Sequence, residues 1–129
     1  MGAGWGGNTV SKYIRMLSDQ RIDVTLVEPN TAFVSCPISN LVLSGRRQIG
    51  DITIGYDKLV AHHGVRLLRG RVATVEADKR QVRLEDGSTL AYDKLVLAPG
   101  VDMMWDSVQG LQAAHAQGRI LHAWKAGAE

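Results

Sequence analysis

Three glycines at the start of the chain constrain its fold more than any other feature. Gly2, Gly4 and Gly7 fill the pattern G-x-G-x-x-G. Behind them, apolar residues recur at the spacing of a helical face over residues 10–17. Residues 21–28 then have the composition of an apolar strand that ends in an acid. The order of glycine turn, amphipathic helix, strand and acid is much more specific than the glycines alone.

Each part of this arrangement has a physical role in a βαβ unit that binds a dinucleotide. Gly2 permits the tight turn, Gly4 lets the backbone approach a pyrophosphate, and Gly7 lets the helix pack closely on the sheet. Free N–H groups at the start of the helix attract the phosphates. Glu28 follows Gly7 by about 20 residues, the distance at which an acid meets the ribose hydroxyls. The alternative for Glu28 is a strand-end acid that only faces water.

The strand that normally precedes such a glycine turn is absent from this sequence. The turn follows only Met1, whereas the first strand of the unit usually lies in the middle of a parallel sheet. We therefore expect a fragment that lacks this strand and the second half of the protein. The alternative is an unusual protein that folds without the strand.

Composition places the chain among globular proteins and excludes several classes of function. It has 129 residues, of which 45% are hydrophobic and 22% are charged, and a net charge of +2. The basic residues are scattered, which argues against nucleic-acid binding. No apolar run reaches the length of a transmembrane helix, and no signal peptide is visible. A single cysteine excludes an internal disulfide and a cysteine-rich metal site, and we expect no metal.

The rest of the chain reads as short helices followed by strands. Pro37 suits the first turn of a helix, and Gly64 suits the end of another. Asp86-Gly87 is typical of the tip of a hairpin. We expect, in order, a helix from residue 37 to 43, an extended piece at 52–54, a helix over 56–63, an antiparallel β-meander over about 65–91, and a buried apolar strand over 93–98.

Several segments resemble the FAD-binding half of the two-dinucleotide flavoprotein reductases, in the pyridine nucleotide-disulfide reductase superfamily. Within it, the chain looks like the flavoprotein subunit of flavocytochrome c sulfide dehydrogenase. The residues that carry the likeness are Gly4-Trp-Gly-Gly7, Lys12-Tyr13-Ile14, Val24-Thr-Leu-Val-Glu-Pro-Asn30, Cys36-Pro-Ile-Ser-Asn40, Gly55-Tyr56-Asp57, Tyr92-Asp93, Ala98-Pro-Gly100 and His122-Ala-Trp-Lys-Ala-Gly127.

The resemblance implies an α/β, Rossmann-like, three-layer FAD-binding fold with an antiparallel β-meander, truncated at its first strand. Residues 1–129 would be the N-terminal part of a discontinuous FAD-binding domain. The second dinucleotide domain and the C-terminal part would be absent. The resemblance assigns the cofactor-binding role to Gly2, Gly4, Gly6, Gly7, Glu28, Pro29, Asn30, Cys36, Asn40, Val72, Ala98, Pro99, Gly100, Trp124 and Lys125.

Cys36 has two interpretations. A lone cysteine is most often a small buried hydrophobe. Its place before Pro37, at the start of an expected helix, would favour the thiolate. The resemblance implies that this cysteine lies against the flavin and can carry it covalently, as a thioether to the 8α-methyl carbon. Pro37 and Ile38 depart from the family's pattern and could shift the sulfur.

The resemblance also implies an enzyme that oxidises sulfide to sulfur and passes electrons to a c-type cytochrome subunit, in the periplasm. The family's redox-active cysteine pair is not in this sequence, so we expect no catalytic residue here and little activity of the chain alone. One alternative is an FAD-dependent NAD(P)H:acceptor or disulfide reductase, which would carry a second glycine motif elsewhere. Another is a non-catalytic nucleotide-binding module, which flavin absorbance would exclude.

Overall fold

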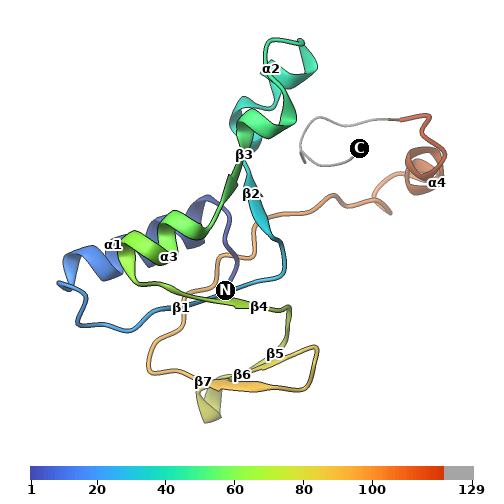
Figure 1. Ribbon diagram of the computed structural model, residues 1–129. Coiled ribbons are helices and arrows are strands. Elements are labelled where there is room, and N and C mark those ends of the chain that lie inside the picture. The colour runs from blue at the N-terminus through green and yellow to red at the C-terminus, as the bar shows by residue number, and fades with distance from the viewer. Residues whose placement is uncertain (121–129) are drawn as a thin grey trace. The chain divides into compact units, whose positions relative to one another are not determined.

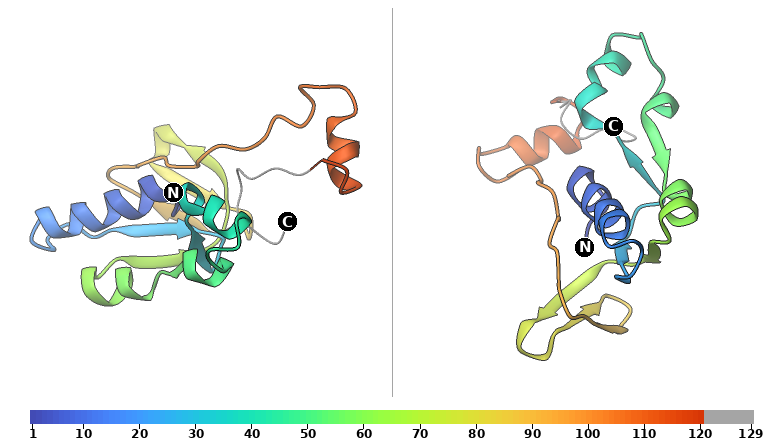
Figure 2. Two further views of the ribbon diagram at one scale, coloured as in Figure 1. Left: turned by 90° about the horizontal axis from the view of Figure 1, so that it is seen from above. Right: turned by 90° about the vertical axis from the view of Figure 1, so that its left-hand side faces the viewer.

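The glycine-rich start folds into a loop that leads directly into a helix. The computed structural model describes residues 1–120. Helix α1 (Trp5–Leu17) begins after the glycine turn, and strand β1 (Thr25–Glu28) follows it and ends at the expected acid. Figure 2 shows α1 running alongside β1, as expected for a βαβ unit. The strand is shorter than the stretch of residues 21–28 that the sequence suggested.

Strand β1 pairs in parallel with β4 (Arg66–Arg69), and this strand pair lies at the centre of the unit (Figure 1). The register places Thr25 opposite Arg66 and Glu28 opposite Arg69. The core beside this pair consists of Ala3, Leu26, Tyr56 and Val65, each at most 4% exposed. The sequence analysis placed residues 65–68 in the antiparallel meander, so their parallel pairing with β1 corrects that expectation.

Helix α3 (Asp57–His63) leads into β4 and ends at Gly64, as predicted. Gly64 has φ 61°, a left-handed conformation that closes the helix and that side-chain-bearing residues rarely adopt. An added Cβ at Gly64 would lie 2.8 Å from Arg15 Nη2. Glycine is therefore needed here for both its conformation and its small size.

The buried face of α1 differs from the apolar face expected from the sequence. Gly7, Ser11 and Arg15 are its buried residues. Leu17, at the end of the apolar stripe that starts at Val10, is 82% exposed. The small residues Gly7 and Ser11 allow α1 to pack closely against the loop and β1. The apolar stripe of the helix is left largely uncovered within the described residues.

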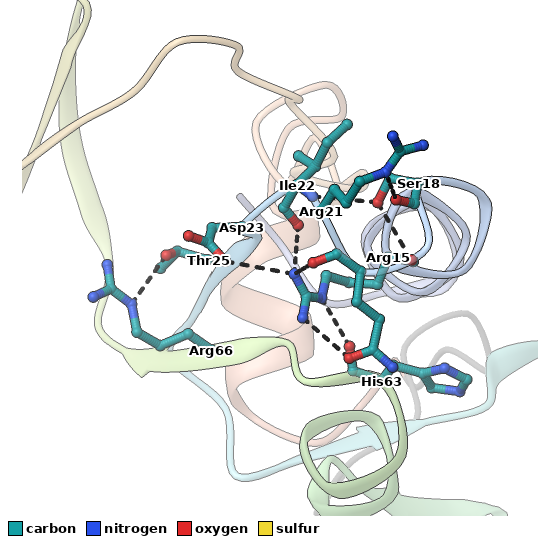
Figure 3. A network of polar contacts seen from close by, with 9 residues as sticks. Arg15, Ser18, Arg21, Ile22, Asp23, Thr25, His63 and Arg66 are labelled. Carbon is teal, nitrogen blue, oxygen red and sulfur yellow. Dashed lines mark hydrogen bonds and ion pairs between the residues drawn. The ribbon is translucent and has the colours of Figure 1, made fainter.

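Arg15 connects three segments of this unit (Figure 3). Its guanidinium donates to the carbonyl of His63 at 3.0 Å, of Gln20 at 2.8 Å and of Ile22 at 2.6 Å. It also lies 3.5 Å from the Asp23 carboxylate, whose side chain is fully exposed. One buried cation thus joins the end of α1, the end of α3 and the approach to β1.

The β-meander consists of β5 (Val72–Glu76), β6 (Gln81–Leu84) and β7 (Thr89–Ala91), which pair antiparallel in that order. A 3₁₀ turn, η3 (Ala77–Lys79), joins the first two strands. Gly87, with φ 84°, lies in the tight hairpin, as Asp86-Gly87 predicted. The meander begins at Val72 rather than near residue 65, because β4 pairs in parallel with β1 instead.

The expected strand over residues 93–98 is not formed as a strand. The segment is extended, and its backbone bonds only to Met1, through Val96 O and Ala98 N, among the described residues. Val96 is 41% exposed and Leu97 58% exposed. Pairing with a single residue cannot build a ladder, which accounts for the missing strand.

The chain divides into two compact units. One contains Met1–Phe33 and Gly55–Gly100, and the other contains Val34–Ile54 and the residues from Val101 onward. The remaining elements are β2 (Ala32–Val34), paired with β3 (Thr53–Gly55), the 3₁₀ turns η1 (Cys36–Ile38) and η2 (Ile49–Ile52), and the helices α2 (Asn40–Leu43) and α4 (Leu111–Ala116).

The architecture is α/β, with both parallel and antiparallel pairing, which confirms the predicted class. Within residues 1–120 no helix is both long enough and apolar enough to cross a membrane.

Candidate cofactor-binding site

The glycine turn has the close packing that its sequence pattern predicts. Gly2 has φ 85°, and its N–H donates to Val27 O at 3.0 Å, which fixes the turn at the end of β1. A Cβ on Gly7 would overlap Gly2 O, and a Cβ on Gly2 would overlap Ala98 O. Both positions therefore exclude any larger residue.

Gly4 differs from these two glycines because it faces open space. No atom lies within 4 Å of a Cβ built on Gly4. It is the residue before α1, and no side chain caps the helix there. The first N–H groups of a helix have no partner within it, and the positive end of the helix dipole favours an anion. The start of α1 is therefore suited to bind a phosphate group.

Trp5 opens α1 and lies beside this position. Its side chain is 59% exposed, and its ring packs edge-on against Phe33 with the centroids 5.4 Å apart. Trp5 therefore packs as an aromatic neighbour of Phe33, and within residues 1–120 no hydrogen bond of the indole gives it a chemical role.

Glu28 connects the glycine turn to the turn that follows β1. The residue is 5% exposed, and Oε2 accepts a hydrogen bond from Ala3 N at 2.6 Å. Oε1 accepts from Asn30 N at 2.9 Å and from Asn30 Nδ2 at 2.6 Å. A carboxylate has about four lone-pair sites, so capacity remains for a hydroxyl donor. Glu28 is thus an organising residue of the loop, and not a strand-end acid facing water.

Ala98 and Pro99, which the resemblance assigned to the cofactor, lie against the glycine turn. Ala98 N donates to Met1 O at 2.9 Å, and the Ala98 Cβ would lie 3.6 Å from a Cβ on Gly6. Gly100 follows with φ 76°. The structure therefore brings together the glycines, Glu28 with its neighbours Pro29 and Asn30, and the segment 98–100.

The sequence reasoning assigned no site role to Tyr56 and Arg69, which lie next to Glu28. Tyr56 is 4% exposed, and the Arg69 guanidinium carbon is 5.3 Å from the centre of its ring. Burial and the charge of Glu28 raise the pKa of Tyr56 to about 12. Arg69 also donates to Thr31 O at 2.9 Å. The family resemblance included Gly55-Tyr56-Asp57 without giving Tyr56 a site role, and Arg69 comes opposite Glu28 only through the register of β1 with β4.

Other predicted site residues are not joined to this group. Val72 begins β5, two residues after Gly70, whose N–H donates to Glu28 O at 3.3 Å. Asn40 and Cys36 belong to the second unit, and Trp124 and Lys125 lie outside the described residues. Their role toward a cofactor stays a prediction.

Cys36 is an exposed free thiol, which contradicts the buried-hydrophobe interpretation. Its Sγ lies 3.9 Å from Val34 O. Cys36 and Pro37 lie in the three-residue 3₁₀ turn η1 and not at the start of an α-helix, and α2 starts only at Asn40. The helix start that the sequence analysis expected beside Cys36 is therefore not formed.

Within residues 1–120 no group of three or more potential ligands could hold a metal ion.

Comparisons with known proteins agree with this geometry. A family model described as pyridine nucleotide-disulphide oxidoreductase matches residues 1–126. A sulfide dehydrogenase (flavocytochrome c) flavoprotein chain from Chlorobaculum thiosulfatiphilum is 60% identical over 42 residues, which cover 33% of this chain and 85% of the relative.

Two solved structures share the fold. The sulfide:quinone oxidoreductase of Aquifex aeolicus has a TM-score of 0.61 at 22% identity, over 71% of this chain and 21% of the other. The putidaredoxin reductase in its covalent complex with putidaredoxin has a TM-score of 0.62 at 26% identity, over 88% of this chain and 28% of the other. The chain thus spans between a fifth and a third of the length of these neighbours.

Proposed function

The chain belongs to the pyridine nucleotide-disulphide oxidoreductase family, and from that membership we propose that it is the FAD-binding part of a sulfide dehydrogenase. Membership implies FAD as the cofactor and an FAD-dependent oxidoreductase as the enzyme. The observation that supports sulfide as the substrate is the 60% identity to the sulfide dehydrogenase flavoprotein chain. In this proposal the enzyme oxidises sulfide to sulfur, passes electrons to a c-type cytochrome subunit and resides in the periplasm.

The residues around the glycine turn fit FAD. The open space at Gly4 and the uncapped start of α1 would receive the pyrophosphate. Glu28 would accept a hydrogen bond from a ribose hydroxyl while it holds Ala3 N and Asn30. Pro99 and Gly100 would border the cofactor beside Gly2. When bound, FAD supplies the electron-accepting chemistry, and these side chains bind and orient it.

Substituting Gly4 tests the FAD site without disturbing the fold. Gly4→Ala has room for its Cβ in the free protein and keeps an ordinary φ of −69°. We expect the free energy of unfolding to change by less than about 1 kcal/mol. The affinity for FAD should fall at least about tenfold, because the methyl group would occupy the place of the pyrophosphate. Fluorescence titration with FAD measures the affinity.

Gly50→Ala is the matched control, because a Cβ at Gly50 also meets no atom within 4 Å and the residue lies in η2. It should bind FAD like the unsubstituted chain. Equal FAD affinity of the Gly4→Ala and Gly50→Ala variants would overturn the proposed pyrophosphate site.

Cys36 is the proposed attachment point of the flavin. Its exposed thiol would be available for a bond from Sγ to the 8α-methyl carbon, with the S–H bond and one methyl C–H bond broken and the two electrons taken up by the oxidised flavin itself. Acid precipitation of the holoprotein, followed by mass spectrometry of the peptide that contains Cys36, should find the mass of the peptide plus flavin. Cys36→Ser should release all flavin into the supernatant. A peptide of unmodified mass from the unsubstituted protein would leave Cys36 without this role.

A second candidate function is an NAD(P)H-dependent reductase. The observation that favours it is the likeness to putidaredoxin reductase, which covers 88% of the chain at 26% identity. Anaerobic mixing of the FAD-loaded full-length protein with either sulfide or NADH distinguishes the two functions. Bleaching of the flavin by NADH, with no response to sulfide, would favour the reductase.

A further inference from the structure

The turn of residues 29–31 joins β1 to β2 and borders the candidate cofactor site. Asn30 bonds this turn to the end of β1, because it donates to Glu28 Oε1 from N at 2.9 Å and from Nδ2 at 2.6 Å. Among residues 1–120, the turn has one hydrogen bond to another strand, and Arg69 of β4 makes it. Arg69 Nη2 donates to Thr31 O at 2.9 Å, across 38 positions of sequence. The position of the turn on the sheet therefore depends on Arg69.

Arg69 lies opposite Glu28 in the parallel register of β1 with β4. Within the described part of the chain, its guanidinium forms no ion pair with that carboxylate. The guanidinium carbon instead lies 5.3 Å from the centre of the Tyr56 ring, a distance at which the ring face attracts a cation. Tyr56 is 4% exposed and belongs to the core, so its ring is a fixed support. The ring and Thr31 O together hold the cation beside Glu28 and not on it.

This arrangement leaves one acceptor site of Glu28 free. A carboxylate has about four lone-pair sites. Ala3 N and the two donors of Asn30 occupy three of them. An ion pair with Arg69 would occupy the fourth. Because Arg69 bonds to Thr31 O instead, the fourth site is left for a donor from a ligand, such as a ribose hydroxyl.

We propose that Arg69 is a positioning residue that makes the site selective for a nucleotide with free ribose hydroxyls. The inference rests on the proposed binding of FAD at the glycine turn. Arg69 fixes Thr31 O, and the fixed turn places both donors of Asn30 on Oε1 of Glu28. The carboxylate, held in this way, presents its remaining lone pair to the ribose. Arg69 acts through the turn and contacts no ligand atom in this role.

Arg66 offers a matched control on the same strand. It lies opposite Thr25 at the other end of the strand pair and is exposed, as Arg69 is. Its Nε donates to Thr25 Oγ1 at 3.0 Å. Arg66→Met and Arg69→Met therefore remove the same charge from the same strand. Only Arg69→Met removes a hydrogen bond to the turn beside Glu28, so a difference between the variants reports on that bond.

The first measurement uses the ligand-free 129-residue chain and follows amide hydrogen exchange by NMR. The Ala3 N–H bonds to Glu28 Oε2 at 2.6 Å and thus reports whether the carboxylate is held. Arg69→Met should speed its exchange about tenfold, whereas Arg66→Met should leave it within about twofold. The amide of Arg66, bonded to Val24 O at 2.9 Å, should stay within about twofold in Arg69→Met. This second amide distinguishes local loosening from a general loss of stability.

The second measurement compares ADP with 2′,3′-dideoxy-ADP, which lacks both ribose hydroxyls. NMR titration gives the Kd of each nucleotide. The unsubstituted chain and Arg66→Met should bind ADP about tenfold more tightly, because only ADP can donate to Glu28. In Arg69→Met the ratio of the two Kd values should fall to about threefold or less. Loss of a positive charge weakens both diphosphates alike, so charge alone leaves this ratio unchanged.

Three results would overturn the inference and leave the proposed function standing. They are unchanged exchange of the Ala3 amide in Arg69→Met, a Kd ratio in Arg69→Met equal to that of the unsubstituted chain, and equal effects of Arg66→Met and Arg69→Met. A different result bears on the proposed function. Equal Kd values of the two nucleotides in the unsubstituted chain would remove the ribose contact of Glu28, and this inference with it.

Discussion

Tyr56 lies both in the core of the first unit and next to charged residues of the candidate cofactor site. It is buried between Ala3, Leu26 and Val65, and it lies near both Glu28 and Arg69. Burial makes the largest contribution to raising its pKa to about 12, the Glu28 carboxylate adds to this, and Arg69 partly opposes it. The folded state therefore holds the phenol proton more tightly than the unfolded state does.

This difference predicts a loss of stability in alkali. Between pH 10 and about pH 12 the unfolded state loses the phenol proton while the folded state keeps it. The contribution of Tyr56 is therefore fully present below pH 10 and is lost as the pH rises through about 12. We expect the free energy of unfolding in urea to fall more steeply from pH 9 to pH 11 than in Tyr56→Phe, which cannot ionise. Equal slopes for the two proteins would contradict the assignment.

The sequence predicted the turn at Gly2 and the place of Glu28 at the end of β1 correctly because both depend on local requirements. Turn conformation and spacing are encoded within about 30 residues. It did not predict that Ala3 N and the two donors of Asn30 occupy three of the Glu28 lone pairs, since that depends on side-chain placement. The approach of Arg69 to Tyr56 was not predictable either, because it follows from the β1–β4 register.

At the scale of elements, Arg15 fixes the geometry of helix α1 relative to α3 and β1. Its guanidinium bonds to three carbonyls, and the residue is 7% exposed. Arg15→Met keeps much of the volume but leaves those carbonyls without their donor. We expect a loss of about 2–4 kcal/mol in the free energy of unfolding, measured by urea denaturation.

Asp23→Asn is the control for the charge of this network. The Asp23 side chain is fully exposed at 3.5 Å from Arg15, and an exposed ion pair contributes little. The variant should change stability by less than about 0.5 kcal/mol. A loss as large as that of Arg15→Met would mean that the ion pair, and not the carbonyl bonds, holds the elements together.

The helices and strands also show which structural features a periodic sequence pattern leaves undecided. The spacing over residues 10–17 predicts a helix, and α1 forms, but Gly7, Ser11 and Arg15 are its buried residues. Apolar composition alone predicted a strand at 93–98, yet a ladder also needs a partner edge, which the segment has only at Met1. A local sequence pattern thus predicts whether a segment is a helix or a strand. Tertiary packing decides which face of the helix is buried and whether the strand forms a ladder.

For the whole molecule we predict low stability in the absence of cofactor. Eight apolar residues of the described part are less than 9% exposed: Ala3, Leu26, Val27, Ile52, Tyr56, Val65, Val82 and Leu84. So small a core offsets little conformational entropy. Circular dichroism should show a broad thermal transition, and FAD at 100 times its Kd should add about 2.7 kcal/mol. A sharp cooperative transition of the monomeric, FAD-free chain would contradict this prediction.

The bonds between Met1 and residues 96 and 98 impose an order on biosynthesis. A ribosome adds roughly 5–20 residues per second, so about 5–20 s separate the synthesis of residue 1 from that of residues 96 and 98. During that interval the glycine turn and α1 can assemble only with elements that have already been made, such as β1 and β4. The backbone before the glycine turn is therefore bonded on one side while the chain grows, and on both sides once residues 96 and 98 have been made.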